Sequence, residues 1–226
     1  MLNAILYRKR NGCVWRCLPH DLPPWELVYY HFKIWRGRRV FERINDELRR
    51  AEREREGRKA EPSVGIVDSQ SVRATEMGGA RGFDAGKLVK GRKRHVLVDV
   101  LGILLAVVVT GANVQDRDGF ALVTGGVSSH LPTLETILVD SAYNGDPIAT
   151  FQKQSSVKVE ITKRPEGSKG FVVVAKRWVV ERAFGWLNRD RLLAKAYERL
   201  TESEVAWIQL ASAGRLVRRL SVSSAG

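Results

Sequence analysis

Hydrophobic and polar residues alternate at helical spacing through the first sixty residues of the chain. Apolar side chains recur every three or four positions, which predicts three helices over residues 2–10, 25–35 and 40–58. We expect these helices to form a small N-terminal module, residues 1–60. The second helix carries more aromatic surface than Leu2, Ile5 and Leu6 of the first can cover. The natural element is therefore expected to begin upstream of Met1, which makes this module truncated.

From Ser63 the pattern changes to short apolar runs between turn residues. These runs predict strands over residues 64–68, 94–100, 103–110, 136–140 and 157–162. Helical spacing returns over residues 115–125, 146–154, 172–196 and 202–220. Leu101-Gly102 joins the second and third runs, so these are expected to form a hairpin. The mixture of strands and helices predicts an α/β domain over residues 61–226.

The net charge adds an expectation about the partner. The 226 residues include 38 Lys plus Arg and 25 Asp plus Glu, so the formal net charge is +13, which favours nucleic acid as the partner. The two cysteines, Cys13 and Cys17, exclude a disulfide scaffold and fit a reducing cytoplasm. The longest apolar run, over residues 101–109, is about half as long as a membrane-spanning helix. We expect neither membrane insertion nor secretion.

Two of the predicted strands end in aspartate, at Asp68 and Asp140. The carboxyl ends of neighbouring strands meet at one crevice of an open α/β sheet, so these side chains are expected to converge. Two carboxylates repel each other unless a divalent cation holds them, and oxygen ligands suit Mg²⁺ or Mn²⁺ better than zinc. The alternative is that each aspartate only caps a turn. Their equivalent positions in a basic chain favour the metal site.

A third acid, Glu181, lies in the long predicted helix. It stands between Val180 and Phe184, which are expected to pack on the sheet. A carboxylate there is either a third metal ligand or the partner of Arg177, four residues earlier on the helix. The residues alone leave these two interpretations equal.

Five motifs follow one another along this chain. They are Val67-Asp-Ser-Gln-Ser-Val72, Gly91-Arg-Lys-Arg-His-Val-Leu-Val-Asp99, Asn113-Val-Gln-Asp-Arg-Asp118, Val139-Asp-Ser-Ala-Tyr143 and Arg177-Trp-Val-Val-Glu-Arg-Ala-Phe184. In sequence and order they closely resemble the insertion-sequence-5 family of DDE transposases, which is related to the insertion sequence 4 transposases. The segment before Pro24 is similar to the helical N-terminal region of that family.

The resemblance implies a ribonuclease-H-like domain, a mixed five-stranded sheet with helices. Its catalytic and metal-binding residues would be Asp68, Asp140 and Glu181, with Mg²⁺ or Mn²⁺ as cofactor. The implied activity is DNA cleavage at the ends of an insertion element, followed by strand transfer. The implied partners are the terminal inverted repeats, target DNA and further copies of this chain, in the bacterial cytoplasm at the nucleoid. Residues 1–60 would bind DNA or join subunits. The alternatives are a truncated, non-catalytic DNA-binding regulator and a stand-alone ribonuclease-H-like nuclease.

The basic residues around these motifs are the expected DNA contacts. Val174 and Asn188 replace the Tyr and Lys that the related families often carry around the third acid. Arg191 or Lys195, one and two helical turns further, is expected to take over the phosphate contact. The Gly-rich stretch over residues 78–94 is expected to be a mobile basic loop on DNA, in preference to a solvated hairpin. The predicted DNA-binding set is Lys90, Arg92, Lys93, Arg94, Arg177, Asn188, Arg191 and Lys195.

Overall fold

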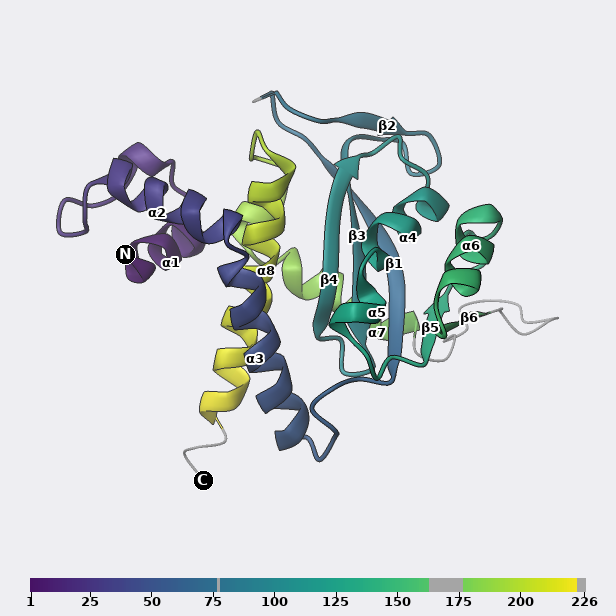
Figure 1. Ribbon diagram of the computed structural model, residues 1–226. Coiled ribbons are helices and arrows are strands. Elements are labelled where there is room, and N and C mark those ends of the chain that lie inside the picture. Colours follow the sequence, from purple (N-terminus) through teal and green to yellow (C-terminus); the bar gives the residue numbers. More distant parts are fainter. Residues whose placement is uncertain (77, 163–176, 223–226) are drawn as a thin grey trace.

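The computed structural model describes residues 1–76, 78–162 and 177–222 of the chain (Figure 1). Three helices come first, and they confirm the helical N-terminal segment. They are α1 (Leu2–Asn11), α2 (Trp25–Gly37) and α3 (Val40–Arg55), with a short 3₁₀ turn η1 (Trp15–Cys17) between α1 and α2. Within the described residues, none of the helices has the length and apolar character that crossing a membrane requires.

A mixed sheet of six strands forms the centre of the molecule. The strands are β1 (Val64–Arg73), β2 (Gly82–Asp84), β3 (Val89–Asp99), β4 (Leu104–Gly111), β5 (Thr136–Val139) and β6 (Lys158–Ile161). β3 pairs antiparallel with β1, β2 and β4, whereas β5 runs parallel to both β1 and β6. The expected β3–β4 hairpin is confirmed, with Gly102 at φ 76° in its turn. β2 is a strand beyond the five expected.

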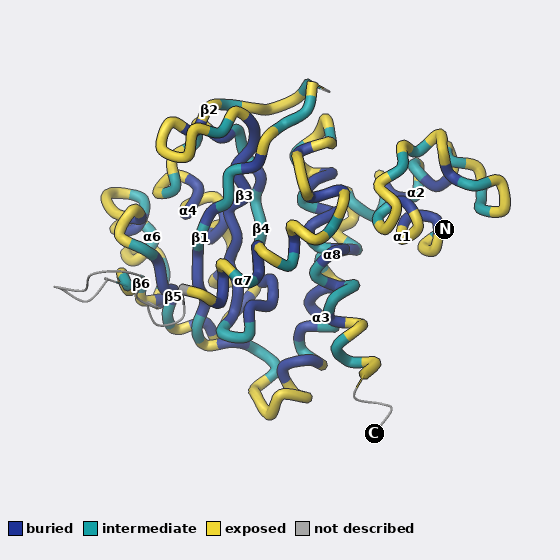
Figure 2. The backbone as a smooth tube through the Cα atoms, turned by 180° about the vertical axis from the view of Figure 1, so that it is seen from behind, coloured by how far each residue is buried: buried dark blue, intermediate teal, exposed yellow. Residues whose placement is uncertain are grey.

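Helices cover both faces of this sheet and divide its apolar side chains between two cores (Figure 2). One face packs against α4 (Asp116–Thr124), α5 (Val127–His130) and α6 (Asp146–Gln154). The other face packs against α7 (Arg177–Leu187) and α8 (Thr201–Val222), and α3 lies alongside α8. This arrangement confirms the α/β fold class. It also assigns each strand residue to one of two sides, because successive side chains alternate.

Several elements differ in length from their predictions, and β3 begins at Val89 rather than at Arg94. β1 continues from Asp68 to Arg73 because its pairing with β3 is unbroken up to Arg73, although these residues are largely polar. The helix expected over residues 172–196 is described from Arg177 and already ends at Leu187. A second 3₁₀ turn, η2 (Arg191–Leu193), follows, and Asp190 caps it by accepting the Leu192 N–H at 3.3 Å. The start of the predicted helix, with Val174, lies outside the described residues.

The N-terminal helices and the α/β part share one core. The ring of Phe32 on α2 stacks on Trp207 of α8 at 4.7 Å, and Trp15 lies 5.9 Å from Trp207. Phe32 and Trp207 are both buried. Phe32 of the aromatic face of α2 therefore has a partner within this chain, whereas the expected segment upstream of Met1 stays a prediction. Trp207 lies about 175 residues further along the sequence, where helical spacing alone does not reveal the contact.

Candidate active site

Pairing between β1 and β5 brings the two candidate aspartates to neighbouring strands. In the parallel register, Ile66 lies opposite Leu138, and two residues further along each chain come Asp68 and Asp140. Asp68 lies within β1 rather than at its end, whereas Asp140 directly follows β5. This register puts the two positions on adjacent strands, and their convergence in one site stays a prediction.

Strand alternation indicates the face on which these aspartates lie. Ile66 and Leu138 belong to the core that includes α7, so residues two positions later point to the same side. α7 packs against β1 and buries Val180 and Phe184 in that core. Glu181 lies next to Val180 on the exposed side of the same helix. The fold thus brings β1, β5 and α7, the three elements that carry the candidate acids, to one face.

Backbone N–H groups orient both aspartates. The Ser69 N–H donates to Oδ1 of Asp68 at 2.7 Å, and the Ala142 N–H donates to Oδ1 of Asp140 at 2.8 Å. Each carboxylate is held by the turn or strand that follows it, which limits its rotation. Such restraint favours a preformed ligand site, since less side-chain entropy is lost on binding a cation.

Tyr143, in the fourth sequence motif, is a buried residue whose hydroxyl is affected by the charges of both aspartates. Its side chain is fully buried. Burial raises the pKa of the Tyr143 hydroxyl far above its ordinary value, and the charges of Asp68, Asp116 and Asp140 raise it further. Sequence reasoning did not select Tyr143, although its place beside Asp140 in the motif was the available signal.

A polar network lies on the opposite side of β1, next to Asp68. Ser69 Oγ donates to Asp116 Oδ1 at 2.7 Å, and Lys93 Nζ lies 3.0 Å from the same Asp116 oxygen. Lys93 also lies 3.2 Å from Asp84 Oδ2, which accepts a hydrogen bond from Ser71 at 2.6 Å. The network ties β1, β2, β3 and α4 together directly behind the candidate site.

The two carboxylates of this network are held ionised. Burial alone would raise the pKa of Asp84, but hydrogen bonds from Ser71 and the Lys87 peptide and the charge of Lys93 lower it to about 2. For Asp116, burial is likewise outweighed by Ser69 and Lys93, so its pKa is lowered. Sequence reasoning missed both residues, although Asp116 stands in the third motif. Their partners come from separate strands, so the pairing becomes visible only in the folded sheet.

The placement of the basic stretch as a loop on DNA is wrong for three residues. Arg92, Lys93 and Arg94 lie in β3 and are buried. Arg92 and Arg94 donate to Glu204 of α8 at 3.1 and 2.7 Å, and Lys93 belongs to the network behind Asp68. A guanidinium buried against a carboxylate has no access to a DNA phosphate. Lys90, by contrast, is exposed at the start of β3.

The remaining predicted DNA contacts lie at and beyond the end of α7. Asn188, Arg191 and Lys195 are exposed, but the chain turns after Leu187, so they do not continue one helical face as predicted. The side chain of Arg177 lies outside the part that the structure describes.

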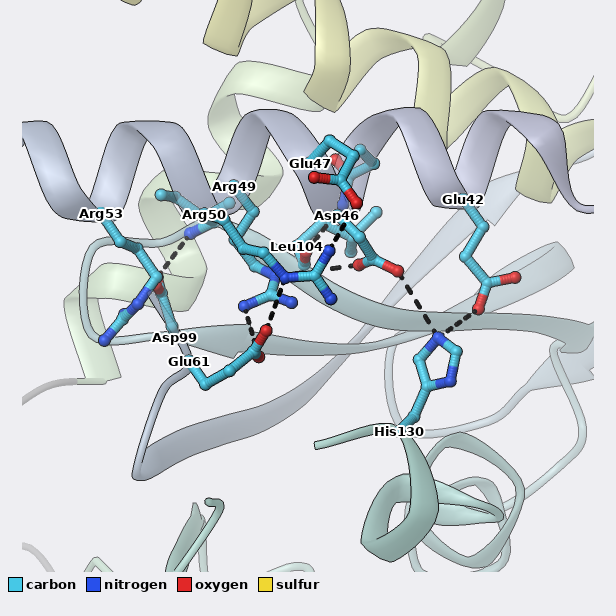
Figure 3. Close-up of polar contacts among 12 residues, drawn as sticks. Glu42, Asp46, Glu47, Arg49, Arg50, Arg53, Glu61, Asp99, Leu104 and His130 are labelled. Atoms are coloured by element: carbon cyan, nitrogen blue, oxygen red, sulfur yellow. Dashed lines mark hydrogen bonds and ion pairs between the residues drawn. The ribbon is translucent and has the colours of Figure 1, made fainter. Parts of the chain in front are cut away.

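A second group of possible metal ligands lies elsewhere in the molecule. His130 Nε2, on α5, is 3.4 Å from Glu42 Oε1 and 3.5 Å from Asp46 Oδ2, both on α3 (Figure 3). Within the described residues it is the group that combines three such side chains closely enough to hold an ion. However, His130 precedes β5 whereas Asp140 follows it, so the two residues are separated by the length of that strand. Glu42 is also already bound by Arg39.

Comparisons with known proteins match both parts of the chain. The family model described as "Transposase DDE domain" matches residues 59–213, which include all six strands, α7 and the three candidate acids. The model described as "Putative transposase of IS4/5 family" matches residues 1–45. The chain is also 28% identical, over 127 residues, to the "Putative transposase for insertion sequence element IS402" of Burkholderia cepacia. That alignment covers 53% of this chain and 60% of the relative.

Proposed function

Because the chain belongs to the family of DDE transposases, we propose that it cuts DNA at the ends of an insertion element and joins those ends to target DNA. One observation supports the proposal: β5 pairs with β1 and α7 packs against β1, and these are the three elements that carry or adjoin Asp68, Asp140 and Glu181. These are the residues to which the family resemblance assigns catalysis and metal binding.

The proposed cofactor is Mg²⁺ or Mn²⁺, held by Asp68, Asp140 and Glu181. All three donors are carboxylates, and hard divalent cations prefer oxygen ligands of this kind. Such cations, when bound, activate water or a DNA 3′-hydroxyl and stabilise the leaving oxygen. The chain itself orients the carboxylates of Asp68 and Asp140 through backbone N–H groups. The Ser69–Asp116–Lys93 network fixes the strand behind Asp68.

The proposed partners are the terminal inverted repeats of the element, target DNA and further copies of this chain. The net charge of +13 supports an anionic partner. Exposed Lys90, Asn188, Arg191 and Lys195 remain proposed contacts with DNA. We further propose that the helical segment 1–60 binds the element ends or joins subunits, and that the protein acts at the bacterial nucleoid in the cytoplasm.

The test is metal-dependent cleavage of labelled duplex DNA that carries the element ends. Asp68→Asn, Asp140→Asn and Glu181→Gln should each abolish nicking in Mg²⁺ and leave DNA binding largely intact, because one metal ligand is removed without a change in shape. Glu160→Gln, which removes an exposed carboxylate from neighbouring β6, is the matched control and should nick at the wild-type rate. A nicking-competent variant among the first three would remove that residue from the site.

The same assay separates the alternatives. Wild-type protein that binds the ends but does not nick them in Mg²⁺ or Mn²⁺ would be a non-catalytic regulator. Nicking without any joined product would identify a nuclease that lacks strand transfer. The appearance of joined product, abolished in all three acid variants, supports the transposase.

A further inference from the structure

A large groove lies beside α7, outside the candidate active site. Its volume is about 1000 Å³, and its walls come from α1, α3, α7, α8 and the strands β3 and β4. The floor is apolar and includes Val96, Leu104 and Leu210. α7 and α8 lie side by side on this face of the sheet (Figure 2). Neither family resemblance nor sequence pattern assigned a role to most of these residues.

The rim of the groove carries an excess of positive charge. Five arginines line it: Arg10, Arg189, Arg191, Arg215 and Arg218. Within the residues that the structure describes, none of the five pairs with a carboxylate. The one acid of the rim, Asp190, is bound by Lys9. An anionic occupant would balance these charges.

Arg215 is partly buried near two other arginines. Burial lowers the pKa of its guanidinium to about 9, and the nearby charges of Arg219 and Arg182 contribute. Glu52 and Asp99 act in the opposite direction, but they already pair with Arg219 and Arg53. Arg215 and Arg218 also line a second, smaller pocket with Arg55 and Arg219, so the basic surface extends along α8.

A stack of tryptophan and arginine side chains connects the groove to the candidate active site. Arg182 lies 4.3 Å from the ring centroid of Trp178 and 4.7 Å from that of Trp186, and Arg215 lies over Trp186 as well. At 100° per residue, Trp178, Arg182 and Trp186 occupy the strip of α7 between Glu181 and the face that lines the groove. Trp178 is 45% exposed.

We propose that the groove between α7 and α8 binds backbone phosphates of the DNA strand that enters the candidate active site. Arg215 and Arg218 on one side and Arg189 and Arg191 on the other are the phosphate contacts, since guanidinium groups bind phosphate oxygens in pairs. Trp178 offers an aromatic surface for a base next to Glu181. An acidic peptide would satisfy the same charges, but it would leave the stack that leads to Glu181 unexplained. The inference rests on the proposed function.

The test measures DNA affinity of the full chain by fluorescence anisotropy in EDTA, with a labelled duplex, between 50 and 200 mM salt. Arg215→Gln/Arg218→Gln should lower the slope of log affinity against log salt by about 1.8, roughly 0.9 for each phosphate that the variant no longer neutralises. Raising the salt fourfold lowers the affinity of both proteins. The fold-loss of affinity should be about twelve times larger for the wild type than for the variant. Arg189→Gln/Arg191→Gln should lower the slope by a similar amount. Both positions are exposed, so this variant tests the groove without removing the partly buried Arg215.

The matched control is Lys153→Gln/Lys158→Gln. It removes two positive charges at exposed positions of α6 and β6, outside both the groove and the proposed DNA contacts, and it should leave the slope closer to the wild-type value. Equal slopes in all three double variants would overturn the groove proposal while DNA binding by the wild type still stands. A wild type that binds no DNA would instead contradict the proposed function. Binding of an acidic oligoglutamate peptide is measured on the same proteins. If the peptide binds the wild type but not the groove variants, and the DNA salt slopes of those variants are unchanged, the groove would be assigned to a protein partner and the proposal would be overturned.

Discussion

Gly119 on α4 lies directly against the ring of His95 on β3. A Cβ atom at position 119 would stand 2.1 Å from two atoms of that ring. His95 is buried, and burial lowers its pKa to about 4, so the ring is neutral near neutral pH. The close approach of α4 to the sheet therefore depends on a residue without a side chain, because a Cβ atom would overlap the buried ring.

Gly119→Ala should destabilise the protein by roughly 1–3 kcal/mol, the usual range for overpacking a core. Gly185→Ala is the matched control on α7, where a new Cβ meets no atom within 4 Å. It should stabilise the protein by up to about 1 kcal/mol, since alanine favours a helix over glycine. Urea unfolding of both variants checks the pair. Equal free energies of unfolding would show that α4 shifts freely away from β3.

The candidate role of a residue could be predicted where it depends on neighbouring sequence. The burial and ion pairing of a residue could not be predicted where they depend on a partner far away in the chain. Asp68 and Asp140 were recognisable because each follows a run of apolar residues, and the β1–β5 register puts them on adjacent strands. The burial of Arg92 and Arg94 depends on Glu204, which lies about 110 residues further along the chain. The sequence of a basic segment is the same whether its side chains contact DNA or a buried carboxylate.

α8 is the element that holds the sheet and the N-terminal helices together. Its Glu204 is buried and accepts from Arg92 at 3.1 Å and from Arg94 at 2.7 Å. Burial lowers the pKa of Arg94, and the charge and hydrogen bond of Glu204 oppose that effect. A single carboxylate thus compensates two guanidinium groups inside the protein.

Glu204→Gln should destabilise the protein by roughly 3–5 kcal/mol, because it leaves two buried cations without an anion. Glu202→Gln, two residues earlier and exposed on the same helix, should change the stability by less than about 0.5 kcal/mol. Thermal unfolding at constant pH measures both. A Glu204 variant as stable as the Glu202 variant would mean that water reaches Arg92 and Arg94.

Element types could be read from periodicity, but element ends depended on partners. α6 spans the predicted residues 146–154, because its apolar spacing and Pro147 at its start are local signals. β1 exceeds its prediction because β3 supplies hydrogen bonds to polar residues as far as Arg73. α7 ends early where Asp190 caps the following turn and binds Lys9 of α1.

At the scale of the whole molecule, residues 1–60 and 61–226 differ in sequence pattern but not in core. Val28 and Phe32 of α2 and Phe41 of α3 are buried together with Trp207 of α8. Arg53 of α3 pairs with Asp99 at the end of β3, and Asn45 donates to the Leu104 carbonyl at 2.9 Å. The sequence marks a change of pattern at Ser63, but it contains no signal for contacts across that change.

This shared core predicts that residues 61–226 do not fold cooperatively alone. Without the first sixty residues, Trp207 and the buried side of α8 would face water, and Asp99 would be left without Arg53, its ion-pair partner. Loss of apolar burial on this scale exceeds what a marginally stable domain tolerates. In the full chain, Phe32→Ala should cost roughly 3–5 kcal/mol. Leu27→Ala, at a 44% exposed position of the same helix, should cost much less.

Thermal unfolding followed by near-ultraviolet circular dichroism tests the expectation on three samples: the full chain, residues 61–226, and residues 61–226 mixed with residues 1–60. The isolated segment should lack a cooperative transition, and adding the helical segment should restore one, since the covalent link is only the short stretch between α3 and β1. A sharp transition for residues 61–226 alone, together with a small effect of Phe32→Ala, would show that the α/β part is an independent domain on which the N-terminal helices merely rest.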